Sequence, residues 1–98
     1  MAANRKLTPL LAGRTVQSVE QIENLLTIVF SDGSTMQVKT SGPAAALDFQ
    51  GQRVRKVRQA GALMHMDFAD KTSVALPLAG ATASVLLRDG NGVFEYAD

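Results

Sequence analysis

The 98-residue sequence contains no cysteine and no tryptophan, only three prolines and a single histidine. Without cysteine the chain cannot form disulfides, Cys-ligated zinc sites, thiol nucleophiles or redox motifs. It also lacks an apolar run long enough to span a membrane, and the run over 7–12 is too short for a signal-peptide core and is interrupted by Pro9. These absences predict a soluble, cytoplasmic protein whose fold rests on packing alone.

Charge is sparse and nearly balanced. The chain has 10 Lys and Arg against 9 Asp and Glu, and 46% of its residues are hydrophobic, which is typical of an ordinary globular protein. Its length fits one domain over 1–98. The distribution is less even, since Arg53, Arg55, Lys56 and Arg58 lie close together with no acid among them.

The segment 13–42 is similar in sequence to the segment 51–80, and the two align without a gap. The two segments share eight identities over thirty aligned positions, where roughly two are expected by chance. Substitutions between them keep their character, as where Leu26 of the first matches Met64 of the second and Ile28 matches Met66. We interpret this pattern as an internal duplication.

Each copy predicts three antiparallel strands. In the first copy, apolar residues recur every third position from Val16 to Ile22, which requires a bulge in a strand. Strict alternation over 25–31 follows, and Asp32-Gly33 predicts a two-residue hairpin turn before the strand over 35–40. The second copy has Asp70-Lys71 instead, which suits a mirror-image turn less well and predicts a different turn or a three-residue loop.

Short helices are expected around the strands. Thr8 and Pro9 suit the start of a helical turn over 8–12, and Gly42-Pro43 begins a second helix over 43–50. A third helix is expected over 81–88. The segment 90–96 then resembles the opening of each copy, so the chain should begin a third copy and stop after its first strand.

The predicted fold class is therefore α+β and mainly antiparallel β. It comprises two copies of a short-helix plus three-strand unit and a final strand, arranged as a partly open barrel or a small sandwich. Pro77 has no backbone N–H to donate, so its strand should be an edge strand or Pro77 should face outward from the sheet. The final strand should pair within its own chain or with a neighbour's edge in a homodimer.

Residues suited to catalysis or metal binding are few. His65 and Asp67 lie on one strand face and suit a metal ligand or a general base, but metal sites use three or four ligands. Met64 and Met66 alternate with them, which favours core packing over an adaptable groove. No serine has a nucleophile-elbow setting. The sequence predicts no catalytic residue, no metal site and no cofactor.

The basic cluster is the candidate nucleic-acid site. Arg53, Arg55, Lys56 and Arg58 would lie along one strand and contact phosphates, with an affinity that falls as salt increases. The competing interpretation is an exposed strand with solvated charges, because no aromatic residues are interleaved for base stacking.

These observations favour a non-enzymatic interaction or assembly module. It would form a homodimer or bind a protein partner through an edge strand or the C-terminal strand, with Val93, Phe94 and Tyr96 as the candidate interface. Nucleic-acid binding by the basic cluster is the alternative function. A third hypothesis is an enzyme or ligand-binding protein with a pocket between the two halves, lined by His65, Asp67 or Tyr96.

Overall fold

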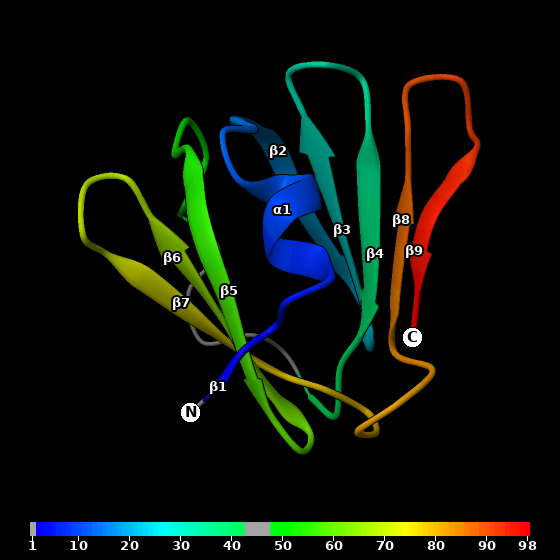
Figure 1. The fold of residues 1–98 in the computed structure, drawn as a ribbon. Coiled ribbons are helices and arrows are strands. Elements are labelled where there is room, and N and C mark those ends of the chain that lie inside the picture. Colours follow the sequence, from blue (N-terminus) through cyan, green and yellow to red (C-terminus); the bar gives the residue numbers. More distant parts are fainter. Residues whose placement is uncertain (1, 43–47) are drawn as a thin grey trace.

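The computed structural model describes residues 2–42 and 48–98 and places them in two antiparallel sheets with one short helix (Figure 1). The four-stranded sheet has the order β1-β5-β6-β7, and the five-stranded sheet has the order β2-β3-β4-β8-β9. In chain order the elements are β1 (Ala2–Ala3), α1 (Leu7–Leu11), β2 (Val16–Ile22), β3 (Leu25–Phe30), β4 (Thr35–Lys39), β5 (Val54–Ala60), β6 (Leu63–Phe68), β7 (Ser73–Pro77), β8 (Val85–Arg88) and β9 (Phe94–Ala97).

The strands β2-β3-β4 and β5-β6-β7 form two three-stranded units with the same register. Val16 pairs with Phe30 in the first unit, and Val54 pairs with Phe68 at the corresponding place in the second. A register shift follows this pair in both units, as the three-residue spacing predicts. Strand β7 ends in Pro77 and is the edge of its sheet, which confirms the edge placement.

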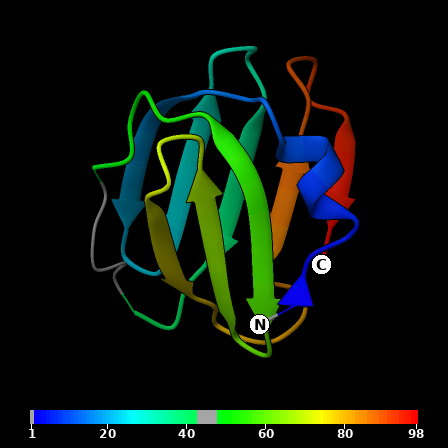
Figure 2. The ribbon, with the colours of Figure 1, turned by 60° about the vertical axis from the view of Figure 1, so that its left-hand side comes forward.

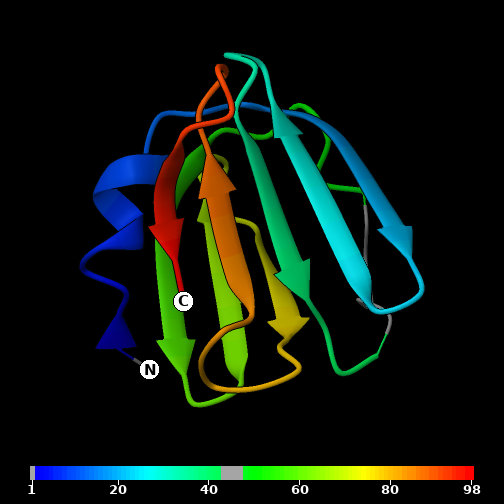
Figure 3. The same ribbon diagram turned by 90° about the vertical axis from the view of Figure 1, so that its right-hand side faces the viewer.

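The core lies between the two sheets, which face each other in Figures 2 and 3. Isolated bridges between Thr15 and Arg53, and between Thr40 and Leu78, join the sheets at two corners. Apolar side chains of both sheets meet in one cluster, as the strand alternation predicts. Its largest fully buried members are Phe30, Phe68, Leu7, Leu11, Leu26, Ile28, Met36, Met64, Met66, Leu76, Leu78 and Leu87.

Helix α1 covers part of this core with Leu7 and Leu11, so the first predicted helical turn is confirmed. Its cap is not Thr8, however. The Asn4 side-chain oxygen accepts hydrogen bonds from the backbone N–H groups of Lys6 (3.2 Å) and Leu7 (2.9 Å). Thr8 lies inside the helix, and its hydroxyl is used elsewhere.

The third predicted helix is wrong, because β8 occupies the second half of 81–88. Val85 pairs with Val38, and Leu87 pairs with Met36. Both Val85 and Leu87 point into the core, and the strand satisfies the backbone of β4, which would otherwise be an edge. An apolar segment of this length fits either element, and the neighbouring strand decides between them.

The predicted third copy is also wrong. The segment over 94–97 is β9, which returns along β8 as the second strand of a hairpin rather than as the first strand of a unit. The prediction of a second helix over 43–50 lies largely outside the described residues. In the part that is described, Asp48 and Phe49 are not helical and Gln50 begins a turn.

The hairpin at Asp32-Gly33 is closed by a three-residue loop, so the two-residue turn predicted there is wrong. Phe30 N–H bonds to Ser34 O (2.9 Å), and Gly33 N–H bonds to Phe30 O (3.0 Å). Only Gly33 has a positive φ, +88°. The Asp32 carboxylate accepts hydrogen bonds from the Ser34 hydroxyl and from the Ser34 N–H (2.9 Å), which stabilise this turn and lower the pKa of Asp32.

The second hairpin uses the same loop, which confirms one of the two alternatives predicted for it. Phe68 N–H bonds to Thr72 O (2.8 Å), and Lys71 N–H bonds to Phe68 O (3.1 Å). Lys71 therefore takes the place of Gly33, with a φ of +72° that is unfavourable for a residue with a side chain.

Candidate functional site

The outward face of the four-stranded sheet is charged. Strand alternation and the register place Lys56, Arg58, His65, Asp67 and Ser73 on this face. The corresponding side chains on the other sheet are mostly uncharged. They are Ser18, Glu20, Thr27, Val29 and Thr35. The two units thus have matching core faces and different outward faces.

The basic cluster surrounds one buried carboxylate. Arg58 Nε and Nη2 donate to the two oxygens of Asp67 at 2.8 and 2.9 Å, a bidentate pair. Arg55 Nη2 lies 3.9 Å from the same carboxylate, and Lys56 is opposite Asp67 in the register. The hydrogen bond from Arg58, reinforced by the charges of its neighbours, holds the pKa of Asp67 below its ordinary value.

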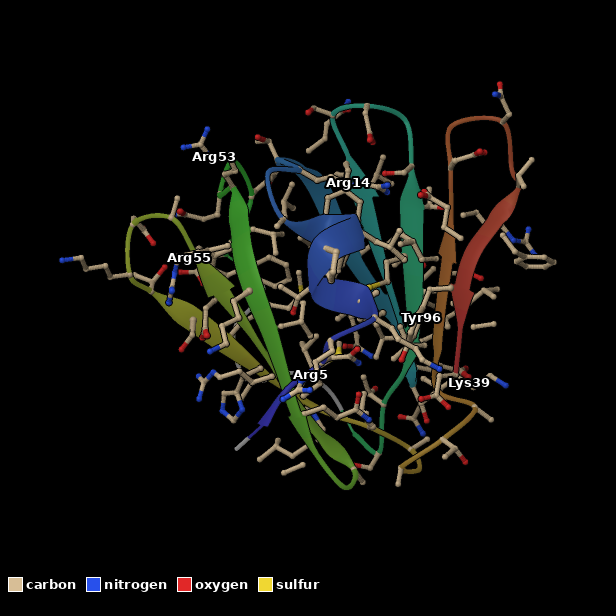
Figure 4. The ribbon with its side chains drawn as sticks, in the orientation of Figure 1. Arg5, Arg14, Lys39, Arg53, Arg55 and Tyr96 are labelled. Atoms are coloured by element: carbon tan, nitrogen blue, oxygen red, sulfur yellow. The ribbon has the colours of Figure 1, made fainter. Side chains whose placement is uncertain are left out.

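The structure therefore separates the four predicted basic residues. Arg58 is engaged by Asp67, and Arg55 and Lys56 lie around that pair. Arg53 is exposed and directly precedes β5, beyond the pair. Figure 4 shows Arg53 and Arg55 pointing outward on the side of the four-stranded sheet. Arg55, Lys56 and Arg58 thus place three positive charges around the single negative charge of Asp67.

Charge is divided between the two sheets and the segments that adjoin them. Residues 1–13 and 48–80, which include the four-stranded sheet, carry seven Lys and Arg and three Asp and Glu. Residues 14–42 and 81–98, which include the five-stranded sheet, carry three Lys and Arg and six Asp and Glu. The near-neutral total conceals a basic half and an acidic half.

His65 is half-buried on the charged face, opposite Arg58 in the register. The carboxylate of Asp67, which was the candidate to assist it, is bonded by Arg58. Among residues 2–42 and 48–98, no group of three His, Cys, Asp or Glu side chains is placed to hold a metal ion.

The three C-terminal candidates do not share one surface. Val93 and Phe94 are 60% and 61% exposed, and the Arg88 guanidinium lies over the Phe94 ring at 4.7 Å. Tyr96 turns toward the core, where its hydroxyl accepts a hydrogen bond from Asn4 Nδ2 (3.2 Å). Burial raises the pKa of Tyr96. Tyr96 therefore ties β9 to the N-terminal segment.

A second contact of β9 involves Arg14, a residue that sequence reasoning missed. Arg14 Nη2 donates to both oxygens of Glu95 at 2.9 and 2.8 Å, and Arg14 Nε lies 3.6 Å from Asp32. Arg14 and Glu95 are far apart in the sequence, so no local pattern predicts the contact. Arg14–Glu95 and Asn4–Tyr96 fasten the C-terminal strand inside its own chain, since both join β9 to the N-terminal part.

The first strands of the two units have different outer edges. In β5, the backbone O of Val57 accepts the Asn4 N–H (2.8 Å), and the Thr8 hydroxyl bonds to both the N–H and the O of Val57 (3.0 Å each). Strand β1 pairs with the next residues of β5. The N-terminal segment therefore covers the β5 edge.

Among the described residues, the equivalent edge of β2 is covered only at its start, by the backbones of Gly51 and Gln52 and by the Gln50 side chain. In the sheet order of the described residues, no strand lies beyond β2. Val19 has the register of Val57, so its backbone N–H and C=O face this bare edge. Ile22, at the end of the strand, is 62% exposed.

Comparisons with known proteins do not assign the chain to a family. No protein-family model, no curated protein and no solved structure matches the chain. Within the described residues, no helix has both the length and the apolar character needed to cross a membrane.

Proposed function

We propose that this protein is a small non-enzymatic interaction module, built from a duplicated three-strand unit, that self-associates through the edge strand β2. The observation that carries the proposal is the difference between two equivalent edges. The chain's own N-terminal segment covers β5, whereas none of the residues that the structure describes covers β2 in this way over 18–22. An uncovered edge offers backbone donors and acceptors to another strand.

The side chains of β2 suit pairing with a second copy. No proline or lysine lies between residues 16 and 22, and Ile22 adds exposed apolar surface. An antiparallel pair centred on Val19 sets Ser18 opposite Glu20 of the second copy, so like charges are not directly opposed. The two five-stranded sheets then become one continuous sheet across a two-fold axis.

The test is the solution mass by light scattering of the wild type and two matched double variants. Ser18→Lys with Ile22→Lys adds charge to the bare edge, and we expect it to convert a dimer into a monomer. Ala60→Lys, at the end of the covered strand β5, with Leu63→Lys, at the start of β6, adds the same charge around the other hairpin, and the dimer should persist. A wild type that stays monomeric at its highest soluble concentration contradicts the proposal.

Nucleic-acid binding by the outward face of the four-stranded sheet is a second candidate, favoured by the excess of basic residues in that half. Arg58 forms the bidentate pair with Asp67, and Arg55 Nη2 lies 3.9 Å from the same carboxylate. One carboxylate cannot neutralise Arg53, Arg55, Lys56 and Arg58 together, so the segment 53–58 has positive charge in excess that can contact phosphates. Affinity would come from phosphates and fall steeply with salt.

The matched variants for this second function leave Arg58 in place, because its loss would strand the buried carboxylate of Asp67. Arg53→Gln, Arg55→Gln and Lys56→Gln together should abolish retardation of labelled DNA and RNA in a low-salt gel. Lys39→Gln with Arg88→Gln, on the other sheet, should not. Absence of any salt-dependent retardation by the wild type rules this function out.

A further inference from the structure

We infer that the outward face of the five-stranded sheet binds a small amphipathic carboxylate, a role separate from self-association. A pocket of about 530 Å³ lies at one end of this face. Its size is that of small-molecule sites, which are mainly apolar with a few polar groups that orient the ligand. Its main side chains are Leu25, Gln37, Lys39, Leu86 and Ala97, and the segment 82–84 closes one side.

The floor of the pocket follows from the strand register. Gln37 of β4 pairs with Leu86 of β8, which pairs with Ala97 of β9, so these three side chains form one row across the sheet. Leu25 pairs with Lys39 in the next row on the same face. The floor is therefore an apolar surface with an amide and an ammonium group along β4. Figure 3 views this face of the sheet.

The wall of the pocket is a loop fixed by one buried serine. Ser84 Oγ donates to Gly80 O (2.9 Å) and accepts the Gly80 N–H (3.1 Å), and Ser84 is 5% exposed. Ala83, which lines the pocket, has a φ of +59°, a left-handed conformation that is costly outside glycine. Such strain persists only where surrounding contacts impose it, and it is common at binding sites. The wall is thus formed before a ligand arrives.

The charge at the rim selects the ligand's head group. Lys39 is exposed, and no carboxylate of the described residues lies within ion-pairing distance of its Nζ. Its backbone is held by Ser84 O (2.7 Å) and by the Ala79 N–H (2.9 Å). Figure 4 places Lys39 beside the lower ends of β8 and β9. Asp98 also lines the pocket, but its side chain accepts a hydrogen bond from Tyr96 (3.3 Å).

These features select a ligand with an apolar body on Leu25, Leu86 and Ala97 and a carboxylate at Lys39. Lys39 supplies a positive charge, and Gln37 adds an amide that can donate to the second carboxylate oxygen. A cation with the same apolar body gains the floor contacts but is repelled at the rim. The preference between the two head groups is therefore the signature of the site.

The experiment is calorimetric titration of the full chain with decanoate below its micelle concentration, and with decyltrimethylammonium as the cation of matched chain length. We expect saturable one-to-one binding of decanoate and none of the cation. Lys39→Gln, which keeps the stem and removes the charge, should weaken binding about tenfold or more, whereas Lys71→Gln should not change it. Leu86→Glu, with its fold checked by circular dichroism, should abolish binding.

Several outcomes overturn the inference. They are the absence of saturable decanoate binding, equal binding of the cation, and an unchanged affinity in Lys39→Gln. An acidic peptide that binds this face when decanoate does not would assign the pocket to a protein partner and also overturn it. Titration of Ser18→Lys with Ile22→Lys separates the two proposals, because decanoate should bind that variant whatever its oligomeric state.

Discussion

The units β2-β3-β4 and β5-β6-β7 have one register and one core pattern, yet their outward faces differ in chemistry. At the outward position where the first unit has Val29, the second has Asp67, bonded to Arg58. Where the first unit has Glu20, the second has Arg58 itself. Inward positions keep apolar residues because they meet in a shared core. The outward positions are not constrained in this way, so the chemical differences between the units are concentrated there.

The largest expected effect tests whether the two core halves are equivalent. Phe30→Ala and Phe68→Ala should each lower the free energy of unfolding by about 3–5 kcal/mol, because both side chains are fully buried. Phe68 also stacks on Phe49 with ring centroids 5.5 Å apart, which adds roughly 0.5–1.5 kcal/mol to its loss. Urea denaturation measures both, and equal losses would show that the stack contributes nothing.

The next effect concerns the covered edge of β5. Thr8→Val keeps the shape of the side chain but leaves the Val57 N–H and C=O without the hydroxyl, which should cost about 1–3 kcal/mol. Thr27→Val on the outward face of the other sheet is the matched control and should change stability by under about 0.5 kcal/mol. If both variants unfold at the same urea concentration as the wild type, the hydroxyl does not stabilise this edge.

The two hairpin loops allow a smaller test in opposite directions. Gly33→Ala places a side chain at a φ of +88° and should destabilise the protein by about 1–2 kcal/mol. Lys71→Gly relieves the equivalent strain, and after the entropy lost by glycine the net gain should be about 0.5 kcal/mol. Thermal unfolding of both variants checks the signs. A destabilised Lys71→Gly would show that the Lys71 side chain makes a compensating contact.

The smallest effect is a pH dependence, because Arg58 is partly exposed and solvent screens the pair. The pKa of Asp67 is lowered from 3.8, so its contribution to stability is present above that pH and is lost as the pH falls through the folded-state value. Asp67→Asn should be less stable than the wild type near neutral pH, and the two should converge in acid. Parallel urea midpoints from pH 7 to 2 would contradict this assignment.

The sequence predicts the two three-stranded units well because each strand contains its own pattern. The three-residue spacing from Val16 to Val19 identifies the bulge, and alternation from Met64 to Phe68 identifies the inward face. The segment over 81–88 does not contain such a pattern. Its strand forms because β4 presents an edge, which is a property of the assembled sheet and not of the segment.

The candidate site was harder to predict, because its contacts join distant residues. The cluster at Arg53 to Arg58 is visible in the sequence, but the bidentate pairing of Arg58 with Asp67 appears only when the two strands are placed in register. Thr8 has the residue type of a helix cap, yet its hydroxyl covers the edge of β5. The sequence shows which side chains can form ion pairs and hydrogen bonds, but the partner of each one depends on the tertiary structure.

The corner that joins the sheets is built by reciprocal exchange. Residues preceding β5 bond to the start of β2, through Val16 N–H to Gln52 O (2.8 Å), and residues preceding β2 bond to the start of β5, through Val54 N–H to Arg14 O (2.8 Å). The first strand of each unit is therefore hydrogen-bonded by the segment that directly precedes the other unit. We expect the corner to form late in folding, because its contacts span a long loop whose closure costs entropy. At high concentration, two refolding chains can form these corner hydrogen bonds with each other instead of within one chain. The yield of correctly refolded protein should therefore fall as protein concentration rises.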